Sequence, residues 1–179
     1  MILEKCTTPR VQYHVSSYKN RKDYTAGIPQ RTIVSENIVT KQGMNSLNNA
    51  YFRATGTISY WYIIPFSTNT TCVNTMTYES PVFTEFVDYE ETLRQVWSPA
   101  ASANEVISSV ATPAVITINV GSTTILYGCA LVGGPAGVSA KGNTGVSGAI
   151  MYSASLFSGG SLSVEDGYLI AIWAAITQS

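Results

Sequence analysis

The C-terminal half of the chain is a succession of short apolar runs separated by turn residues. The four runs occupy residues 115–120, 123–132, 149–157 and 168–176. Gly, Ser and Pro lie between them, at 121–122, in the Gly-rich stretch 133–148 and at 158–161. Strands at this spacing, with no helical blocks between them, are typical of antiparallel sheets. The sequence therefore predicts an all-β protein, an antiparallel β-sandwich or jelly roll in which each sheet buries one apolar face.

The composition favours one such domain. The chain has 179 residues, of which 12% are charged, whereas about a quarter is usual for globular proteins. Ser, Thr, Asn and Gly take the place of the missing charges, which favours many turns and short strands over long amphipathic helices and argues against a helical bundle. The longest apolar stretches reach about half of the ~20 residues that cross a bilayer, and the N-terminus lacks the basic-then-apolar order of a signal peptide. We expect a soluble protein that is not exported.

The region before these runs contains one expected helix and further extended segments. Met44, Leu47 and Tyr51 recur at helical spacing and predict a short helix over 40–52 with one apolar face. Residues 57–66 are aromatic and β-branched and predict a strand. Residues 82–97 alternate poorly and are expected to be extended, with a break near Glu90 and Glu91.

The N-terminal segment differs from the rest of the chain in its charge. Residues 1–41 hold seven of the ten Lys and Arg residues against three acids, whereas the remainder is net acidic. Residues 1–32 show no sustained periodicity, and we expect them to form an extended basic arm attached to a β-sandwich body, residues 33–179. Within the arm, Val11, Tyr13 and Val15 alternate with polar residues, a short strand signal that suits addition to the sheet edge of a neighbour.

The arm is expected to bind another molecule. Its net charge of +4, counted over 1–41, is modest for nucleic-acid binding through phosphates, and an acidic protein surface fits it at least as well. The candidate contacts are cations and tyrosines that order on binding: Arg10, Tyr13, Tyr18, Lys19, Arg21, Lys22, Tyr24 and Arg31.

Residues typical of catalysis and metal binding are sparse. The single histidine, His14, lies in a polar stretch, and three widely spaced cysteines form no ligand motif. Reduced thiols fit an intracellular compartment. We therefore expect no enzyme activity, no catalytic residue, no cofactor and no metal.

The one acidic cluster has a structural and a chemical interpretation. Glu85, Asp88, Glu90 and Glu91 lie close in sequence, and paired carboxylates can serve glycoside hydrolysis or hold a cation. Charges in a turn between strands are more often solvated, with Arg94 as a surface partner of Glu90 or Glu91. The glycines at 133–137 lack the Lys-Ser/Thr ending of a phosphate-binding loop and predict a flexible hairpin loop.

Aromatic residues in the strand 57–66 are the other candidates for contact. Tyr60, Trp61 and Tyr62 are consecutive, so alternate side chains face opposite sides of a sheet. We assign them, with Trp97, to the core and to contacts between subunits. A stacking surface for bases or sugars is the alternative.

Several ordered strings resemble small capsid cement (decoration) proteins of tailed bacteriophages. The resemblance covers about residues 33–179. Its first strings are 37–44 (NIVTKQGM), 61–63 (WYI) and 83–90 (FTEFVDYE), followed by Arg94 and 97–99 (WSP). Its closing strings are 128–132 (GCALV), 151–157 (MYSASLF) and 164–167 (VEDG). The basic arm has no counterpart in this pattern.

The resemblance implies a structural virion protein made in the host cytoplasm. Such a protein sits on the outer surface of the head, binds the major capsid protein and stabilises the DNA-filled capsid, with no direct contact to nucleic acid or membrane. A homo-oligomer is expected, a trimer in preference to a dimer, because local three-folds are natural docking sites. Two alternatives are a head-fibre or receptor- and glycan-binding virion protein, and a carbohydrate-active enzyme using Glu85 and Glu91.

Overall fold

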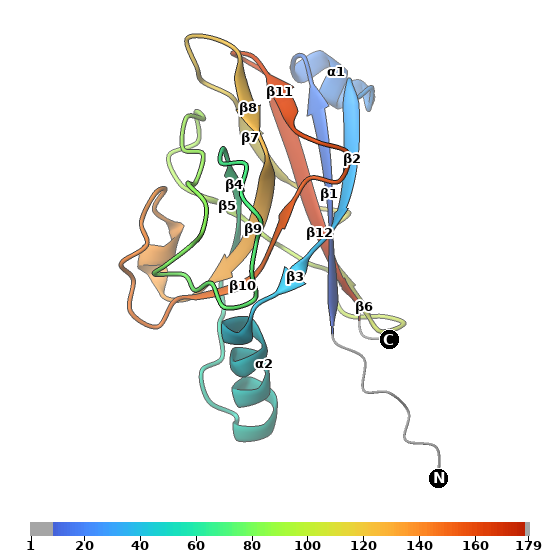
Figure 1. The fold of residues 1–179 in the computed structure, drawn as a ribbon. Helices are drawn as coiled ribbons and strands as arrows, with labels where there is room; N and C mark the ends of the chain where they lie inside the picture. The colour runs from blue at the N-terminus through green and yellow to red at the C-terminus, as the bar shows by residue number, and fades with distance from the viewer. Residues whose placement is uncertain (1–8, 178–179) are drawn as a thin grey trace.

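The computed structural model describes residues 9–177, which are mostly β, in antiparallel sheets with few helices (Figure 1). Two sheets of five strands each are accompanied by a small two-stranded sheet. The expectation of a mostly β chain with antiparallel sheets is confirmed.

The first sheet, here called sheet A, is built around the N- and C-terminal strands. Its order is β2 (Arg31–Glu36), β1 (Arg10–Tyr18), β12 (Leu169–Thr177) and β6 (Val106–Ser108), and β7 (Ala114–Thr117) also pairs with β12. Strands β1 and β12 pair antiparallel over their whole length, with Val11 opposite Ile176 and Tyr18 opposite Leu169.

The second sheet, sheet B, is formed by the middle of the chain. Its order is β3 (Ile38–Val39), β10 (Ile150–Leu156), β9 (Gly128–Gly133), β4 (Trp61–Phe66) and β5 (Gln95–Val96). The small sheet pairs β8 (Thr124–Leu126) with β11 (Leu162–Val164). A short 3-10 helix, η1 (Ala136–Ser139), follows β9.

Side chains from both sheets share one apolar core. Val11 and Ile170 from sheet A and Ile63 and Leu131 from sheet B belong to the same buried cluster. A second buried cluster, containing Phe66 and Met76, lies on the other side of sheet B. The apolar alternation along β1, β7 and β12 therefore points inward, as their sequence patterns require.

The main helix, α2 (Lys41–Arg53), begins at Thr40, whose hydroxyl accepts a hydrogen bond from the Gly43 amide at 2.9 Å. Gly43 is the one buried residue of α2, and a Cβ atom there would lie 2.6 Å from the Tyr152 carbonyl oxygen. The first turn of α2 is thus packed directly on β10. The helix ends at Ala54, and its far end projects from the molecule, at the bottom of Figure 1.

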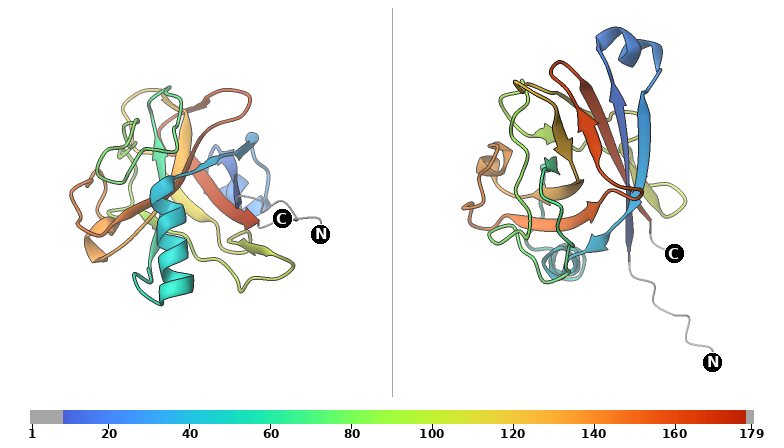
Figure 2. Two further views of the ribbon diagram at one scale, coloured as in Figure 1. Left: turned by 60° about the horizontal axis from the view of Figure 1, so that its bottom comes forward. Right: turned by 45° about the horizontal axis from the view of Figure 1, so that its top comes forward.

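A second short helix, α1 (Arg21–Ala26), connects β1 to β2 at the opposite end of the molecule (Figures 1 and 2). Asn20 caps its start, and Gly27, at φ +66°, ends it in the left-handed conformation that favours glycine. β1, α1 and β2 together form a long hairpin with a helical tip.

The expectation that residues 1–32 form an extended arm is wrong for the described part of this segment, because the hairpin belongs to sheet A. Residues 10–18 form an interior strand of sheet A, between β2 and β12. The expected alternation of Val11, Tyr13 and Val15 is present, but the strand joins the chain's own sheet instead of a neighbour's edge. All three side chains are buried, and their burial against β12 fixes the strand in place. Residues 1–8 of the expected arm lie outside the described residues.

Other expectations vary in their outcome. The expected helix and the runs 115–120, 149–157 and 168–176 correspond to α2, β7, β10 and β12. The run 123–132 is divided at Tyr127 into β8 and β9, and only the second half of 57–66 forms β4. The segment 82–97 consists mainly of loops joined by single bridges, with β5 at its end.

Candidate functional site

Five of the eight candidate contact residues gather where the β1–β2 hairpin turns. We call this group, Tyr18, Lys19, Arg21, Lys22 and Tyr24, the α1 tip. The three cations are exposed, and the two tyrosines are half-buried. The rings of Tyr18 and Tyr24 meet edge to face with centroids 5.2 Å apart, and the Arg21 guanidinium lies 5.8 Å from the Tyr24 ring centroid.

The local sequence explains why these side chains meet. Tyr18 is the last residue of β1, and Tyr24 lies on α1, which the Asn20 cap holds through a 3.0 Å bond from the Asp23 amide. The segment 18–24 carries three cations and one acid, Asp23, so its net charge is +2. The α1 tip is therefore a small basic surface with a preformed aromatic base.

The other three candidate contacts lie elsewhere. Tyr13 is fully buried, which corrects its assignment as an arm contact, because an inward position of an interior strand cannot face a partner. Arg31 donates to the carbonyl oxygens of Ser161 (2.8 Å) and Gly159 (3.1 Å), so it ties β2 to the turn before β11. Arg10 lies at the other end of β1, opposite Thr177.

The four candidate aromatic residues divide between surface and core. Tyr60 is 58% exposed, and Tyr62 and Trp97 are buried. Trp61 is half-buried and contacts the Tyr152 ring edge to face at 5.7 Å. The Trp97 indole donates a 3.2 Å hydrogen bond to the Ala174 carbonyl oxygen, which links the end of β5 to β12. Only Tyr60 of this group is well exposed for contact with another molecule.

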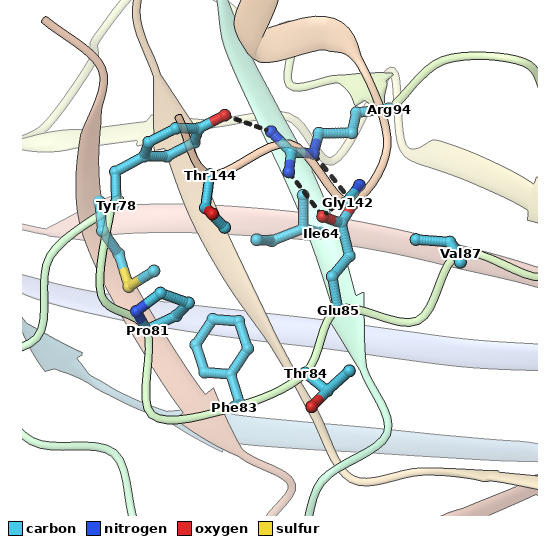
Figure 3. A pocket seen from close by; sticks show the side chains of 11 residues that line it. Ile64, Tyr78, Pro81, Phe83, Thr84, Glu85, Val87, Arg94, Gly142 and Thr144 are labelled. Atoms are coloured by element: carbon cyan, nitrogen blue, oxygen red, sulfur yellow. Dashed lines mark hydrogen bonds and ion pairs between the residues drawn. The ribbon is translucent and has the colours of Figure 1, made fainter. Parts of the chain in front are cut away.

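The expected surface position of Arg94 is wrong. Arg94 is buried, and its partner is Glu85, not Glu90 or Glu91. Arg94 Nε donates to Glu85 Oε1 at 2.9 Å and Nη2 donates to Oε2 at 2.5 Å (Figure 3). This two-pronged geometry matches the planar guanidinium to the carboxylate.

The remaining donors of Arg94 bind groups from three other segments. Nη1 donates to the Tyr78 hydroxyl at 2.9 Å and to the Val138 carbonyl at 2.7 Å, and Nη2 donates to the Asn143 carbonyl at 3.0 Å. Burial opposes the charge of Arg94, but its hydrogen bonds to Glu85 and the charge of Glu85 outweigh burial and raise the pKa of the guanidinium. Arg94 is therefore a structural clamp.

The clamp also corrects the expectation of a flexible loop at 133–148. The Gly142 amide donates to Glu85 Oε2 at 2.9 Å, and the Tyr78 hydroxyl donates to the Asn143 carbonyl oxygen. The Lys141 ammonium donates to the Tyr89 carbonyl at 2.8 Å. These bonds, together with η1, hold the loop on the body of the protein.

Glu91 has a separate structural partner. Its carboxylate accepts hydrogen bonds from the Thr117 amide, at 3.0 and 3.1 Å, and from the Thr117 hydroxyl, at 3.1 Å. Glu91 thus caps the edge of β7, while Glu85 binds Arg94. The acidic residues are not grouped around a shared centre, and within residues 9–177 no set of three His, Cys, Asp or Glu side chains is arranged to hold a metal ion.

A pocket of about 360 Å³ lies beside the Arg94 clamp (Figure 3). Its apolar wall consists of Ile64, Pro81, Phe83, Val87 and Met151. Its polar groups are already bonded to one another, except for the exposed threonines Thr84 and Thr144, whose hydroxyls have no partner among the described residues. The pocket is suited to an apolar group with a hydrogen-bonding edge.

The end of α2 carries the most exposed large aromatic side chains of the described chain. Tyr51 is 80% and Phe52 is 76% exposed, and their rings meet edge to face at 5.0 Å. Helical spacing predicted one apolar face containing Met44, Leu47 and Tyr51, but Tyr51 lies exposed at its end, because α2 extends past the strand that supports its first turns. We call Tyr51, Phe52 and Arg53 the α2 tip.

Among residues 9–177, no helix has the length and apolar character needed to cross a membrane. No family model matches the chain, and neither a curated protein nor a solved structure matches it.

Proposed function

We propose that the chain is a structural virion protein, a capsid cement (decoration) protein that binds the outer surface of the major capsid protein lattice and stabilises the DNA-filled head. The α1 tip carries this proposal, because it gathers three exposed cations and two tyrosines in edge-to-face contact at one projecting end. The resemblance of residues 33–179 to such proteins supports it. In this proposal the two sheets form a jelly-roll-like sandwich, and the protein is a homo-oligomer, with a trimer favoured.

The chemistry of the α1 tip suits an acidic protein surface. Lys19, Arg21 and Lys22 supply charge that steers and orients docking. The tyrosines supply rigid area that a partner can bury at low entropic cost, as in interface hot spots. In this proposal the β1–β2 hairpin presents the contacts of the α1 tip. Docking therefore does not require an extended arm.

Many copies acting on one lattice allow each contact to be weak. When several α1 tips of one oligomer bind at once, the second and later contacts form at high effective concentration. A surface with few charges and many Ser, Thr and Asn residues suits broad, hydrogen-bonded contact with a capsid.

Binding to capsids tests the proposal. Heads of the virus that encodes the chain, assembled without it, are titrated with the full chain and with Arg21→Glu/Lys22→Glu. We expect the double charge reversal to weaken binding at least tenfold at low salt and less at high salt, where charges are screened. The control is Lys41→Glu, which reverses an exposed cation on α2, and it should bind like the wild type.

Two results would contradict the proposal. One is equal binding of the double variant and the control, which would exclude the α1 tip as the docking surface. The other is a count, by quantitative mass spectrometry of purified particles, of a dozen copies or fewer, because a cement protein is present at a substantial fraction of the major capsid protein. Such a low count with binding to host cells would identify a head-fibre or glycan-binding protein.

A further inference from the structure

We infer that copies of this chain bind head to tail, with the α2 tip of one copy inserted into the pocket beside Arg94 of the next. The inference concerns the homo-oligomer of the proposed function and names its interface. It does not depend on capsid binding, and its partner is a second copy of this chain.

The exposed aromatic pair needs an apolar partner. Phe52 and Tyr51 are 76% and 80% exposed at the end of a helix that projects from the body (Figure 1). Aromatic side chains carry much of the binding energy of protein interfaces when they enter a pocket. Two such rings held against each other at 5.0 Å form a preorganised knob.

The pocket has the size and chemistry to receive it. Its volume of about 360 Å³ is at the lower end of the roughly 300–1,000 Å³ typical of small-ligand sites, which leaves room for an aromatic ring. The Phe52 ring matches the apolar wall formed by residues such as Phe83 and Met151. The Tyr51 hydroxyl has possible partners in the exposed hydroxyls of Thr84 and Thr144 at the mouth.

The charges of the two surfaces are complementary. Residues 42–60, which include the end of α2, contain one cation, Arg53, and no acid. The residues next to the pocket lining in sequence include two exposed acids, Glu79 and Asp88, and one half-buried cation, Lys141, whose ammonium is bonded to the Tyr89 carbonyl. Arg53, directly after Phe52, would therefore meet a negative rim, which fixes the orientation of docking.

The same chain cannot fill its own pocket. Gln42, in the first turn of α2, accepts hydrogen bonds through Oε1 from the amides of Tyr78 (3.0 Å) and Met151 (2.8 Å), which both line the pocket. The pocket thus lies at the base of α2. The helix has 13 residues, so it spans about 20 Å at 1.5 Å per residue and carries the tip away from the base.

A tip that meets a base makes a heterologous contact, in which two different surfaces of the same chain bind each other. Contacts of this kind close into rings when the rotation between copies allows it. A ring of three copies satisfies every tip and every pocket, in agreement with the favoured trimer.

Complementing variants test this arrangement in solution, without capsids. The first variant, Tyr51→Ala/Phe52→Ala, removes the knob, and the second, Thr144→Trp, fills the pocket from its exposed mouth. Ile28→Ala removes an apolar side chain that is 64% exposed at the other end of the molecule and serves as the control. Circular dichroism and thermal unfolding verify that each variant folds, and Val87→Trp replaces Thr144→Trp if the latter does not.

Sedimentation at micromolar concentration gives the result. We expect the wild type and Ile28→Ala to be oligomers, and each interface variant alone to be at least tenfold weaker in self-association. A mixture of the two should form a one-to-one dimer, because one variant retains its pocket and the other its knob, yet the pair cannot close a ring.

Three results would overturn the inference: a monomeric wild type, variants that still form the full oligomer, or a mixture that remains as dissociated as its components. Self-association retained by Thr144→Trp and lost only by Tyr51→Ala/Phe52→Ala would indicate a tip-to-tip contact. If self-association is lost but the α1 tip still docks to capsids, the capsid proposal is retained and this inference is rejected. If capsid binding fails but the variants behave as expected in solution, this inference is retained and the capsid proposal is rejected.

Discussion

The Tyr13 hydroxyl lies 2.8 Å from Ser153 Oγ, and this contact joins the two sheets across the core. Tyr13 belongs to β1 of sheet A and Ser153 to β10 of sheet B, and both side chains are inaccessible to solvent. Burial, above all, raises the pKa of Tyr13, so the phenol remains a neutral hydrogen-bonding group. The N-terminal strand is therefore fixed to the fold from two sides, by β12 in its own sheet and by β10 opposite.

Removing this hydroxyl should destabilise the protein. In Tyr13→Phe the buried Ser153 hydroxyl loses its partner, and we expect the free energy of unfolding to fall by about 1–3 kcal/mol. Urea denaturation measures the change. Tyr60→Phe removes the same atom from an exposed ring and should be nearly neutral. Equal effects of the two changes would exclude a structural role for the inter-sheet contact.

Replacing only one partner of the Arg94–Glu85 ion pair should destabilise the protein more than replacing both partners. We expect Arg94→Met to lower the free energy of unfolding by about 3–5 kcal/mol, since it leaves the Glu85 carboxylate buried without its partner. Arg94→Met/Glu85→Leu should lose less than Arg94→Met alone. Arg10→Met, at an exposed arginine of β1, is the control. Chemical denaturation of these variants and of the single variant Glu85→Leu gives the comparison, and a double variant as unstable as the sum of Arg94→Met and Glu85→Leu would contradict the coupling.

Gly43 should tolerate no side chain. In an isolated helix, Gly→Ala adds up to about 1 kcal/mol of stability. Here the new methyl group would lie 2.6 Å from the Tyr152 carbonyl oxygen, so we expect Gly43→Ala to destabilise the protein and loosen α2 from β10. Hydrogen exchange of the α2 amides and thermal unfolding measure both effects. Asn48→Ala, at an exposed position of the same helix, should be neutral or stabilising.

The pH dependence of stability should contain a contribution from His14. Its ring stacks on Trp173, with centroids 3.6 Å apart and planes within 6°, and burial lowers its pKa below 6.5. The unfolded chain then binds a proton more readily than the folded chain, so stability falls as the pH decreases below 6.5. In His14→Phe, which keeps an aromatic ring at this position, the decrease between pH 7 and 5 should be smaller.

A direct titration gives a second check of the same group. His14 is the single histidine of the chain, so its ring resonances in an NMR titration need no assignment by mutagenesis. We expect a pKa below the ordinary value, and a shift back toward it in Trp173→Ala, which opens the ring to water. A wild-type value at or above 6.5 would show that the stack does not desolvate the imidazole.

The sequence predicted those helices and strands whose buried and exposed positions follow a clear hydrophobic periodicity within the segment itself. The run that became β12 and the helix that became α2 have the correct periodicity, and Thr40 is a good helix cap. The pairing of β1 could not be predicted in this way. Val11, Tyr13 and Val15 alternate as in any half-buried strand, and nothing in the segment indicates that its partner is β12 instead of another chain.

The candidate site was predicted in part for the same reason. The cations and tyrosines of the α1 tip lie within seven residues of sequence, so their clustering follows from any tight turn there. The prediction that Arg94 lies at the surface was wrong, because its burial depends on hydrogen bonds to Glu85, Tyr78 and Val138. These partners come from separate segments of the chain. The exposure of Tyr51 depends on where the sheet beneath α2 ends, and helical periodicity alone does not contain that information.

The pairing of β1 with β12 also governs when the molecule can form during synthesis. β1 is translated before its neighbour on one side, which consists of residues 169–177, so the backbone hydrogen-bonding groups on that side of β1 must wait until residues 19–168 have been translated. Contacts between residues so distant in sequence slow folding. A ribosome that stops before β12 would release a chain in which one edge of β1 is open and prone to aggregation, and folding thereby distinguishes copies that contain β12 from copies that lack it.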